Sequence, residues 1–140
     1  MRAVIDTSVL VSGLLSRRSY PARVLDAWVF NQFTPVVSPD LAKEYASVLA
    51  REKFNSPGPV EKRLHVLEKL LSLPWVVMVY PAEKVIAVSS DPKDNMVLEC
   101  AVGGKARWVV TGDQHLLSLG SFGDFTVVTA AQFAKVLCLL

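Results

Sequence analysis

The stretch that decides the fold is Asp91–Leu117, DPKDNMVLECAVGGKARWVVTGDQHLL, which places an apolar helix and an apolar strand between two acidic turns. Asp91–Pro92 pairs a capping residue with a proline, the usual order at the first turn of a helix. Asp94 then lies in that first turn, on the same face as the apolar residues three, four and seven positions later. The run 108–111 is predicted to form a buried strand, and Asp113 follows it. In open α/β sheets, functional groups gather just beyond the carboxyl ends of strands.

The bulk composition indicates one domain with a large core. The 140 residues, 15.3 kDa in mass, match the size of a single domain, so residues 1–140 are predicted to fold as one unit. Hydrophobic residues make up 51% and charged residues 20%, which excludes a mainly disordered chain. The net charge of +2 gives no strong long-range attraction for a polynucleotide. Binding to nucleic acid would therefore need local basic residues or a bound metal.

The cysteines and the N-terminus indicate a soluble, cytoplasmic protein with no membrane partner. Cys100 and Cys138 belong to no metal-ligand spacing, and both are predicted to be buried, reduced thiols. Asp6 interrupts the apolar run near the start, which argues against a signal peptide. No apolar run is long enough to span a membrane.

Outside the deciding stretch, short apolar runs alternate with amphipathic helices. A helix is predicted from about Asp40 to Lys53, residues 85–88 form a short apolar segment, and residues 118–123 form a turn-rich loop. The alternation predicts an α/β fold, a three-layer α/β/α sandwich around a parallel sheet of about five strands. The predicted strands are Ala3–Ile5, Pro35–Val37, Trp75–Tyr80, Trp108–Thr111 and Phe125–Val128.

Four acidic residues are predicted to meet at one edge of this sheet. Asp6 and Asp113 each follow a strand, Asp94 begins a helix, and Glu44 lies on the apolar side of its helix near the start. Taken singly, each fits a structural role: Asp6 and Asp113 as helix caps, Asp94 as a charge at the positive helix end, and Glu44 as the border of an apolar stripe.

Taken together, the four acids predict a metal site. Crowded carboxylates repel each other unless a cation neutralises them. Oxygen ligands without histidine or cysteine prefer Mg²⁺ or Mn²⁺. Such ions activate water and stabilise the leaving oxygen in phosphodiester hydrolysis.

Four blocks of the sequence resemble, in order, those of the PIN-domain family: VIDTSVLVSGLL, the helix with Glu44, DPKDNMVLECA and WVVTGDQHLL. The resemblance covers nearly the whole chain and is greatest to the VapC-like ribonuclease toxins of toxin–antitoxin pairs. It implies an endoribonuclease that depends on Mg²⁺ or Mn²⁺, with Asp6, Glu44, Asp94 and Asp113 as the catalytic, metal-binding acids. It also implies RNA as substrate, products with 5′-phosphate and 3′-hydroxyl ends, a cognate antitoxin protein and a homodimer.

The resemblance also assigns supporting residues. Ser8 and Thr111 match positions whose hydroxyls hold the acids or a phosphate, although both equally fit a helix cap and a strand. Asn95 either orients Asp94 or faces solvent. Many family members carry a further acid where this chain has His115, so the number of metals stays open. His115 either contacts substrate phosphate or donates a proton, or it is a partly exposed polar residue.

Basic residues near the predicted site are the candidates for contact with RNA. Lys93, beside a proposed ligand, is the strongest, followed by Arg17 and Arg18; each also fits a solvated surface charge. Two other functions stay open. One is a PIN scaffold without catalysis that binds RNA or a protein. The other is an aspartate-phosphorylating domain, which is disfavoured because Ser8 stands where a haloacid dehalogenase needs its second aspartate.

Overall fold

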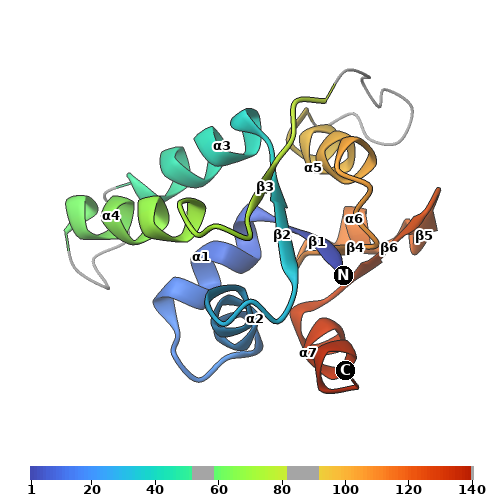
Figure 1. The fold of residues 1–140 in the computed structure, drawn as a ribbon, viewed down its shortest axis with the longest axis horizontal. Helices are drawn as coiled ribbons and strands as arrows, with labels where there is room; N and C mark the ends of the chain where they lie inside the picture. The colour runs from blue at the N-terminus through green and yellow to red at the C-terminus, as the bar shows by residue number, and fades with distance from the viewer. Residues whose placement is uncertain (52–58, 82–91, 140) are drawn as a thin grey trace.

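The computed structural model describes residues 1–51, 59–81 and 92–139 and contains helices and strands in alternation (Figure 1). In chain order they are β1 (Arg2–Ile5), α1 (Thr7–Leu15), α2 (Tyr20–Val29), β2 (Thr34–Val37), α3 (Pro39–Leu49), α4 (Val60–Leu71), β3 (Val77–Met78), α5 (Pro92–Gly103), β4 (Trp108–Val110), α6 (Gln114–Leu117), β5 (Ser121–Phe122), β6 (Phe125–Val128) and α7 (Ala130–Cys138).

The strands form one sheet in which β1 is central. Within the described residues the sheet has six strands in the order β3-β2-β1-β4-β6-β5, and every pairing is parallel except that of β5 with β6. The chain leaves β1 toward β2 on one side and returns to β4 on the other. In the β1–β4 pair, Val4 lies opposite Val109 and Ile5 opposite Val110. The carboxyl ends of β1 and β4 therefore lie side by side, at the point where the strand order reverses.

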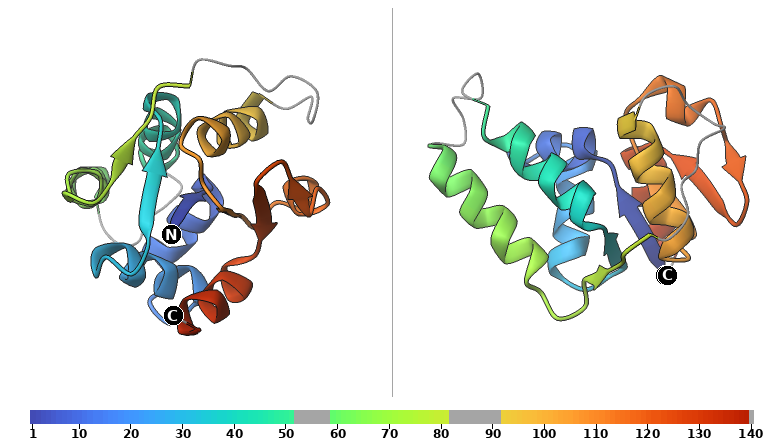
Figure 2. Two further views of the ribbon diagram at one scale, coloured as in Figure 1. Left: turned by 45° about the vertical axis from the view of Figure 1, so that its right-hand side comes forward. Right: turned by 90° about the horizontal axis from the view of Figure 1, so that it is seen from above.

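Helices pack on both sides of the strands, which confirms the predicted α/β class. The views in Figures 1 and 2 show α5 and α7 on opposite sides of the strands. Helix α5 rests on β1, β2 and β4, while α2 packs against α1 and α7. The strands are apolar on both faces, as a covered parallel sheet requires. The largest fully buried side chains include Trp28, Tyr45, Phe133, Ile5, Leu10 and Leu98.

Several boundaries differ from the sequence prediction. Strand β3 covers only Val77–Met78 instead of Trp75–Tyr80, because the indole N–H of Trp75 donates to the Trp28 carbonyl oxygen (2.7 Å), which holds the chain outside the sheet before β3. The predicted loop 118–123 contains β5, which pairs antiparallel with β6. The predicted segment 85–88 lies outside the described residues.

The cysteine prediction is correct for one residue only. Cys100 is fully buried, and burial raises the pKa of its thiol to about 12, so it is an inert core residue. Cys138 is exposed, because it lies in the last turn of α7, beyond the packed face that contains Phe133. No helix in the described part of the chain is both long enough and apolar enough to cross a membrane.

Helix α3 ends at Leu49, four residues before the predicted end at Lys53, and a buried arginine accounts for this. Arg63 of α4 is only 3% exposed. Its Nε donates to the Leu49 carbonyl oxygen (2.8 Å) and its Nη2 to the Arg51 carbonyl oxygen (3.3 Å). The guanidinium thus satisfies carbonyl groups that a helix end leaves without intrahelical partners.

We expect Arg63→Met to lower the free energy of unfolding by about 2–4 kcal/mol, because buried carbonyls lose a charged donor. Urea unfolding followed by tryptophan fluorescence measures the change. Lys62→Met removes an exposed charge from the same helix and is the matched control. Equal stability of the two variants would contradict a structural role for Arg63.

Candidate active site

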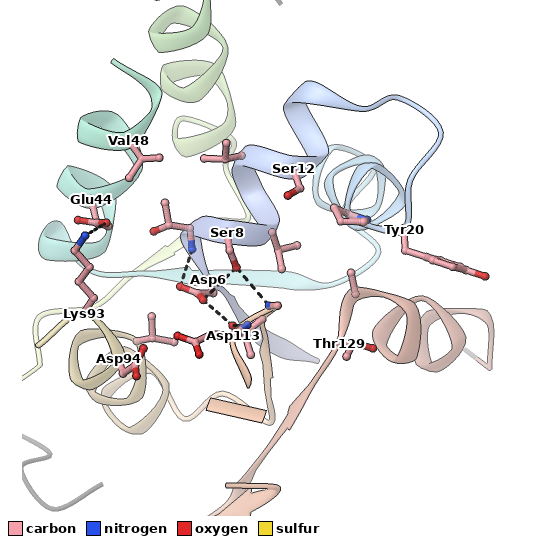
Figure 3. A pocket seen from close by; sticks show the side chains of 18 of the residues that line it. Asp6, Ser8, Ser12, Tyr20, Glu44, Val48, Lys93, Asp94, Asp113 and Thr129 are labelled. Atoms are coloured by element: carbon pink, nitrogen blue, oxygen red, sulfur yellow. Dashed lines mark hydrogen bonds and ion pairs between the residues drawn. The ribbon is translucent and has the colours of Figure 1, made fainter. Parts of the chain in front are cut away.

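A cavity of about 810 Å³ opens at the carboxyl ends of the central strands (Figure 3). Its lining comes from α1, α3, α5, the β4–α6 turn and the first residues of α2 and α7. Asp6, Glu44, Asp94 and Asp113 all line it. Four acids from four separate parts of the chain thus line one cavity.

Asp6 is fixed by hydrogen bonds to both of its carboxylate oxygens. Its Oδ1 accepts from the backbone N–H of Thr7 (2.8 Å), which makes Asp6 the N-cap of α1. Its Oδ2 accepts from the hydroxyls of Thr111 (2.6 Å) and Ser8 (3.3 Å). The backbone N–H of Asp6 donates to the Val110 carbonyl oxygen (2.9 Å), which continues the β1–β4 pairing to the acid itself.

Asp113 is held by the same network from the β4 side. Its backbone N–H donates to Thr111 Oγ1 (3.0 Å), and its Oδ1 accepts from the backbone N–H of His115 (2.8 Å). Ser8 Oγ also accepts from the backbone N–H of Gly112 (3.3 Å), which ties α1 to the β4–α6 turn. Asp113 is therefore the N-cap of α6 and also lines the cavity. Both aspartates therefore cap a helix and line the cavity at the same time.

Glu44 and Asp94 reach the cavity from helices α3 and α5. Asp94 is 5% exposed and lies in the first turn of α5. Glu44 pairs with Lys93 across the gap between these helices, with 3.5 Å between Nζ and Oε1 (Figure 3). Tyr45, the residue after Glu44, is fully buried and its hydroxyl donates to the Ile5 carbonyl oxygen. That bond holds α3 beside the strand that precedes Asp6.

The charges in the cavity are only partly balanced. Burial raises the pKa of Asp6, hydrogen bonds from Thr111, Thr7 and Ser8 oppose the rise, and the negative charge of Asp113 adds to it. A cation would relieve this repulsion. None of the described residues lining the cavity is a histidine or cysteine, so its donors suit Mg²⁺ or Mn²⁺.

The four acids are nevertheless not drawn together as a finished ligand set. Within residues 1–51, 59–81 and 92–139, no three acidic, histidine or cysteine side chains are close enough to hold a metal ion. Glu44 is engaged by Lys93, whose side chain is 59% exposed. Because the lysine end is in water, this ion pair is screened and contributes only ~0–1 kcal/mol, although Glu44 itself is only 18% exposed. The carboxylates fit the metal by chemistry and by shared lining, and binding requires adjustment of side chains.

The remaining predicted residues divide into two groups. Ser8 and Thr111 line the cavity and bond Asp6, and Lys93 lines it as well. The others lie outside the lining: Asn95, which is half-buried, and His115, Arg17 and Arg18, which are exposed. Arg17 and Arg18 occupy the turn that leads from α1 to α2.

The sequence prediction missed one end of the cavity. Tyr20, Pro21 and Thr129, from the starts of α2 and α7, also line it. Their sequence signals were those of helix starts, with a proline near N1 of α2 and a capping threonine before α7. Nothing in the spacing placed these two helix starts beside the acids; the sheet order does, because it puts β6 next to β4.

We expect Thr111→Val to raise the pKa of Asp6 further above its usual 3.8, because the Thr111 hydroxyl is the strongest hydrogen bond that lowers it. A carbon-13 NMR titration of the metal-free protein measures this pKa. The free energy of unfolding should fall by about 1–3 kcal/mol, because the Asp113 amide also loses its hydrogen-bond acceptor.

The loss of unfolding free energy in Thr111→Val should be larger at neutral pH than well below pH 3.8, where Asp6 is protonated in folded and unfolded chains alike. Thr34→Val makes the same change at a half-buried strand residue and serves as control. An Asp6 pKa that is unchanged in Thr111→Val would show that the hydroxyl does not hold the carboxylate.

The fold and the cavity define a class of protein: a parallel α/β/α domain with carboxylates gathered where the strand order reverses. Comparison with known proteins gives the family. The model of the PIN domain matches residues 2–115, and the chain belongs to the PIN-domain family.

Known proteins similar to this chain include the following three. The uncharacterized protein MJ1680 of Methanocaldococcus jannaschii is 28% identical over 119 residues, which covers 85% of this chain and 75% of that protein. The crystal structure of PAE2754 from Pyrobaculum aerophilum has a TM-score of 0.68 at 17% identity and covers 100% of this chain and 91% of that one. VapBC2 from Rickettsia felis, bound to a DNA fragment from its promoter, has a TM-score of 0.61 at 14% identity over 92% of this chain and 98% of that one.

Proposed function

We propose that this protein is a metal-dependent endoribonuclease that hydrolyses phosphodiester bonds in RNA, with Asp6, Glu44, Asp94 and Asp113 as its catalytic acids. The observation that carries the proposal is that these four carboxylates, from separate parts of the chain, line one cavity. Membership of the PIN-domain family supports it, because PIN domains are generally nucleases.

Asp6, Glu44, Asp94 and Asp113 would hold Mg²⁺ or Mn²⁺, the ions that oxygen donors prefer. When bound, such an ion supplies a water of lowered pKa and stabilises charge on the phosphoryl oxygens. Hydrolysis of the bond between phosphorus and the 3′-oxygen would leave a 5′-phosphate and a 3′-hydroxyl, with water supplying the hydroxyl to phosphorus and the proton to the 3′-oxygen. Because Asp6 and Asp113 are anchored by hydrogen bonds, they would provide the fixed side of the site.

The chain's own residues would orient the acids and the substrate. Thr111 and Ser8 bond the Asp6 carboxylate and so limit its rotation. Lys93 is the cation of the cavity best placed to meet a phosphate, because it lines the cavity and its side chain is 59% exposed. Its ammonium, which pairs with Glu44, would add attraction for an RNA phosphate beside the acids.

The test is cleavage of a mixed RNA pool by the purified protein with Mn²⁺, Mg²⁺ or a chelator. We expect cleavage only with metal, and a decrease of about 100-fold or more in Asp94→Asn, because losing a ligand costs several kcal/mol of transition-state stabilisation. Mapping the ends should give 5′-phosphates. Asp124→Asn, an exposed acid in the β5–β6 turn, should cleave like wild type.

A thermal-shift measurement with Mn²⁺ separates metal binding from catalysis: wild type should be stabilised, and Asp94→Asn less so. Metal-dependent stabilisation without cleavage of any RNA would leave a PIN scaffold that binds RNA or protein. If Mn²⁺ neither supports cleavage nor stabilises the protein, the proposed metal site is wrong as well.

We also propose that the protein is the toxin of a toxin–antitoxin pair, forms a homodimer and is inhibited by an antitoxin protein. The likeness in fold to VapBC2 supports this. Exposed apolar residues at the C-terminal ends of α2 and α7 could form such contacts, notably Phe30 at 72% exposure, Leu139 at 88% and Val29 at 44%.

Sedimentation at equilibrium should give about twice the 15.3 kDa chain mass, and Phe30→Asp should shift it toward the monomer because a charge would enter an apolar contact. Tyr80→Asp, at a residue of comparable exposure (77%) outside α2 and α7, is the control. A monomeric wild type at micromolar concentration would contradict the homodimer.

A further inference from the structure

An aromatic residue lines the end of the cavity that lies away from the proposed metal-binding acids. Tyr20, the first residue of α2, lines the cavity together with the four acids. Its side chain is 47% exposed, although it is large and apolar over most of its surface. Figure 3 shows it on the side of the cavity away from Glu44 and Lys93, with its ring projecting outward beside the start of α7.

The ring is accompanied by positive charge. The guanidinium carbon of Arg23, one helical turn later, lies 5.1 Å from the centroid of the Tyr20 ring. Arg17 and Arg18, both exposed, lie in the turn just before α2. The acids at the centre of the cavity repel RNA phosphates, and the chain's net charge is only +2. This arginine group is therefore a local source of attraction at the Tyr20 end.

The backbone that carries Tyr20 is held in place. Ser19 caps α2 by accepting from the backbone N–H of Ala22 (3.2 Å), and its hydroxyl donates to the Ser16 carbonyl oxygen (2.8 Å). Helices α1 and α2 approach so closely at Gly13 that a Cβ there would lie 2.8 Å from the Pro21 carbonyl oxygen. An aromatic side chain on such a backbone loses little conformational entropy when it is covered.

From these observations we infer that Tyr20 is a stacking platform for a nucleobase of the single-stranded RNA that enters the cavity, an inference that rests on the proposed function. An exposed aromatic ring can stack on any of the four bases, because every base has a π-face. Arg23 supports the ring by its cation–π contact and adds attraction for a neighbouring phosphate. RNA would then lie across the cavity, with one base on Tyr20 and the phosphate to be cleaved at the acids.

The experiment uses Asp94→Asn protein, which we expect to bind RNA without cutting it, and a short single-stranded RNA carrying 2-aminopurine. Stacking on tyrosine quenches 2-aminopurine fluorescence, so titration gives both a Kd and a signature of stacking. Tyr20→Leu removes the ring and keeps bulk; we expect a Kd about 5- to 100-fold weaker and loss of the quenching. Tyr20→Phe keeps the ring and should retain both.

Tyr80→Leu is the matched control, because Tyr80 is 77% exposed and does not line the cavity. It should leave the Kd and the quenching unchanged. Equal RNA affinity and quenching in Tyr20→Leu and Tyr80→Leu would overturn the inference while leaving the proposed nuclease intact. If Tyr20→Leu alters only self-association in sedimentation, the ring is a protein contact and the inference is wrong. If the Asp94→Asn protein binds no RNA at all, the proposed function itself fails.

Discussion

The hydrogen bond from the Thr111 hydroxyl to the Asp6 carboxylate is the contact on which the site depends. It joins the residue after β1 to the residue after β4, at the one place in the sheet where the strand order reverses. The parallel pairing of β1 with β4 brings the two ends level, and the Asp113 amide completes the link by donating to the same hydroxyl. A slip of register by one residue would turn these groups to the opposite face of the sheet and dissolve the cavity.

This arrangement makes two aspartates serve stability and the site at the same time. Asp6 and Asp113 cap α1 and α6, so each satisfies a backbone N–H that a helix start leaves unpaired. Burial and the nearby Asp113 charge nevertheless raise the pKa of Asp6, so the ionised carboxylate is held at some cost to the fold. Capping and hydrogen bonding from Thr7, Thr111 and Ser8 offset part of that cost.

The sequence was enough to predict the acid edge, because strand ends and helix starts are local signals. It was less informative where contacts between distant parts of the chain determine the length of a strand or the burial of a side chain. The run WVVMVY has the residues of a strand throughout, but only Val77 and Met78 pair with β2. No local sequence pattern indicated that Arg63 is buried, because the acceptor of its hydrogen bond, the Leu49 carbonyl oxygen, belongs to another helix. The hairpin of β5 and β6 did carry a local signal in Gly123–Asp124, a two-residue turn with Gly123 at φ 58°, that the prediction of a loop overlooked.

The acids of the cavity are held by hydrogen bonds on one side and by a partly exposed ion pair on the other. Asp6 and Asp113 are set by backbone and hydroxyl donors, whereas Glu44 is held by a lysine that is mostly in water. An ammonium beside Glu44 lowers the repulsion among the acids much as a metal ion would, but with weaker and less directional bonds. A divalent ion bound to the fixed aspartates would compete with Lys93 for the Glu44 carboxylate, so metal binding and this ion pair would oppose each other.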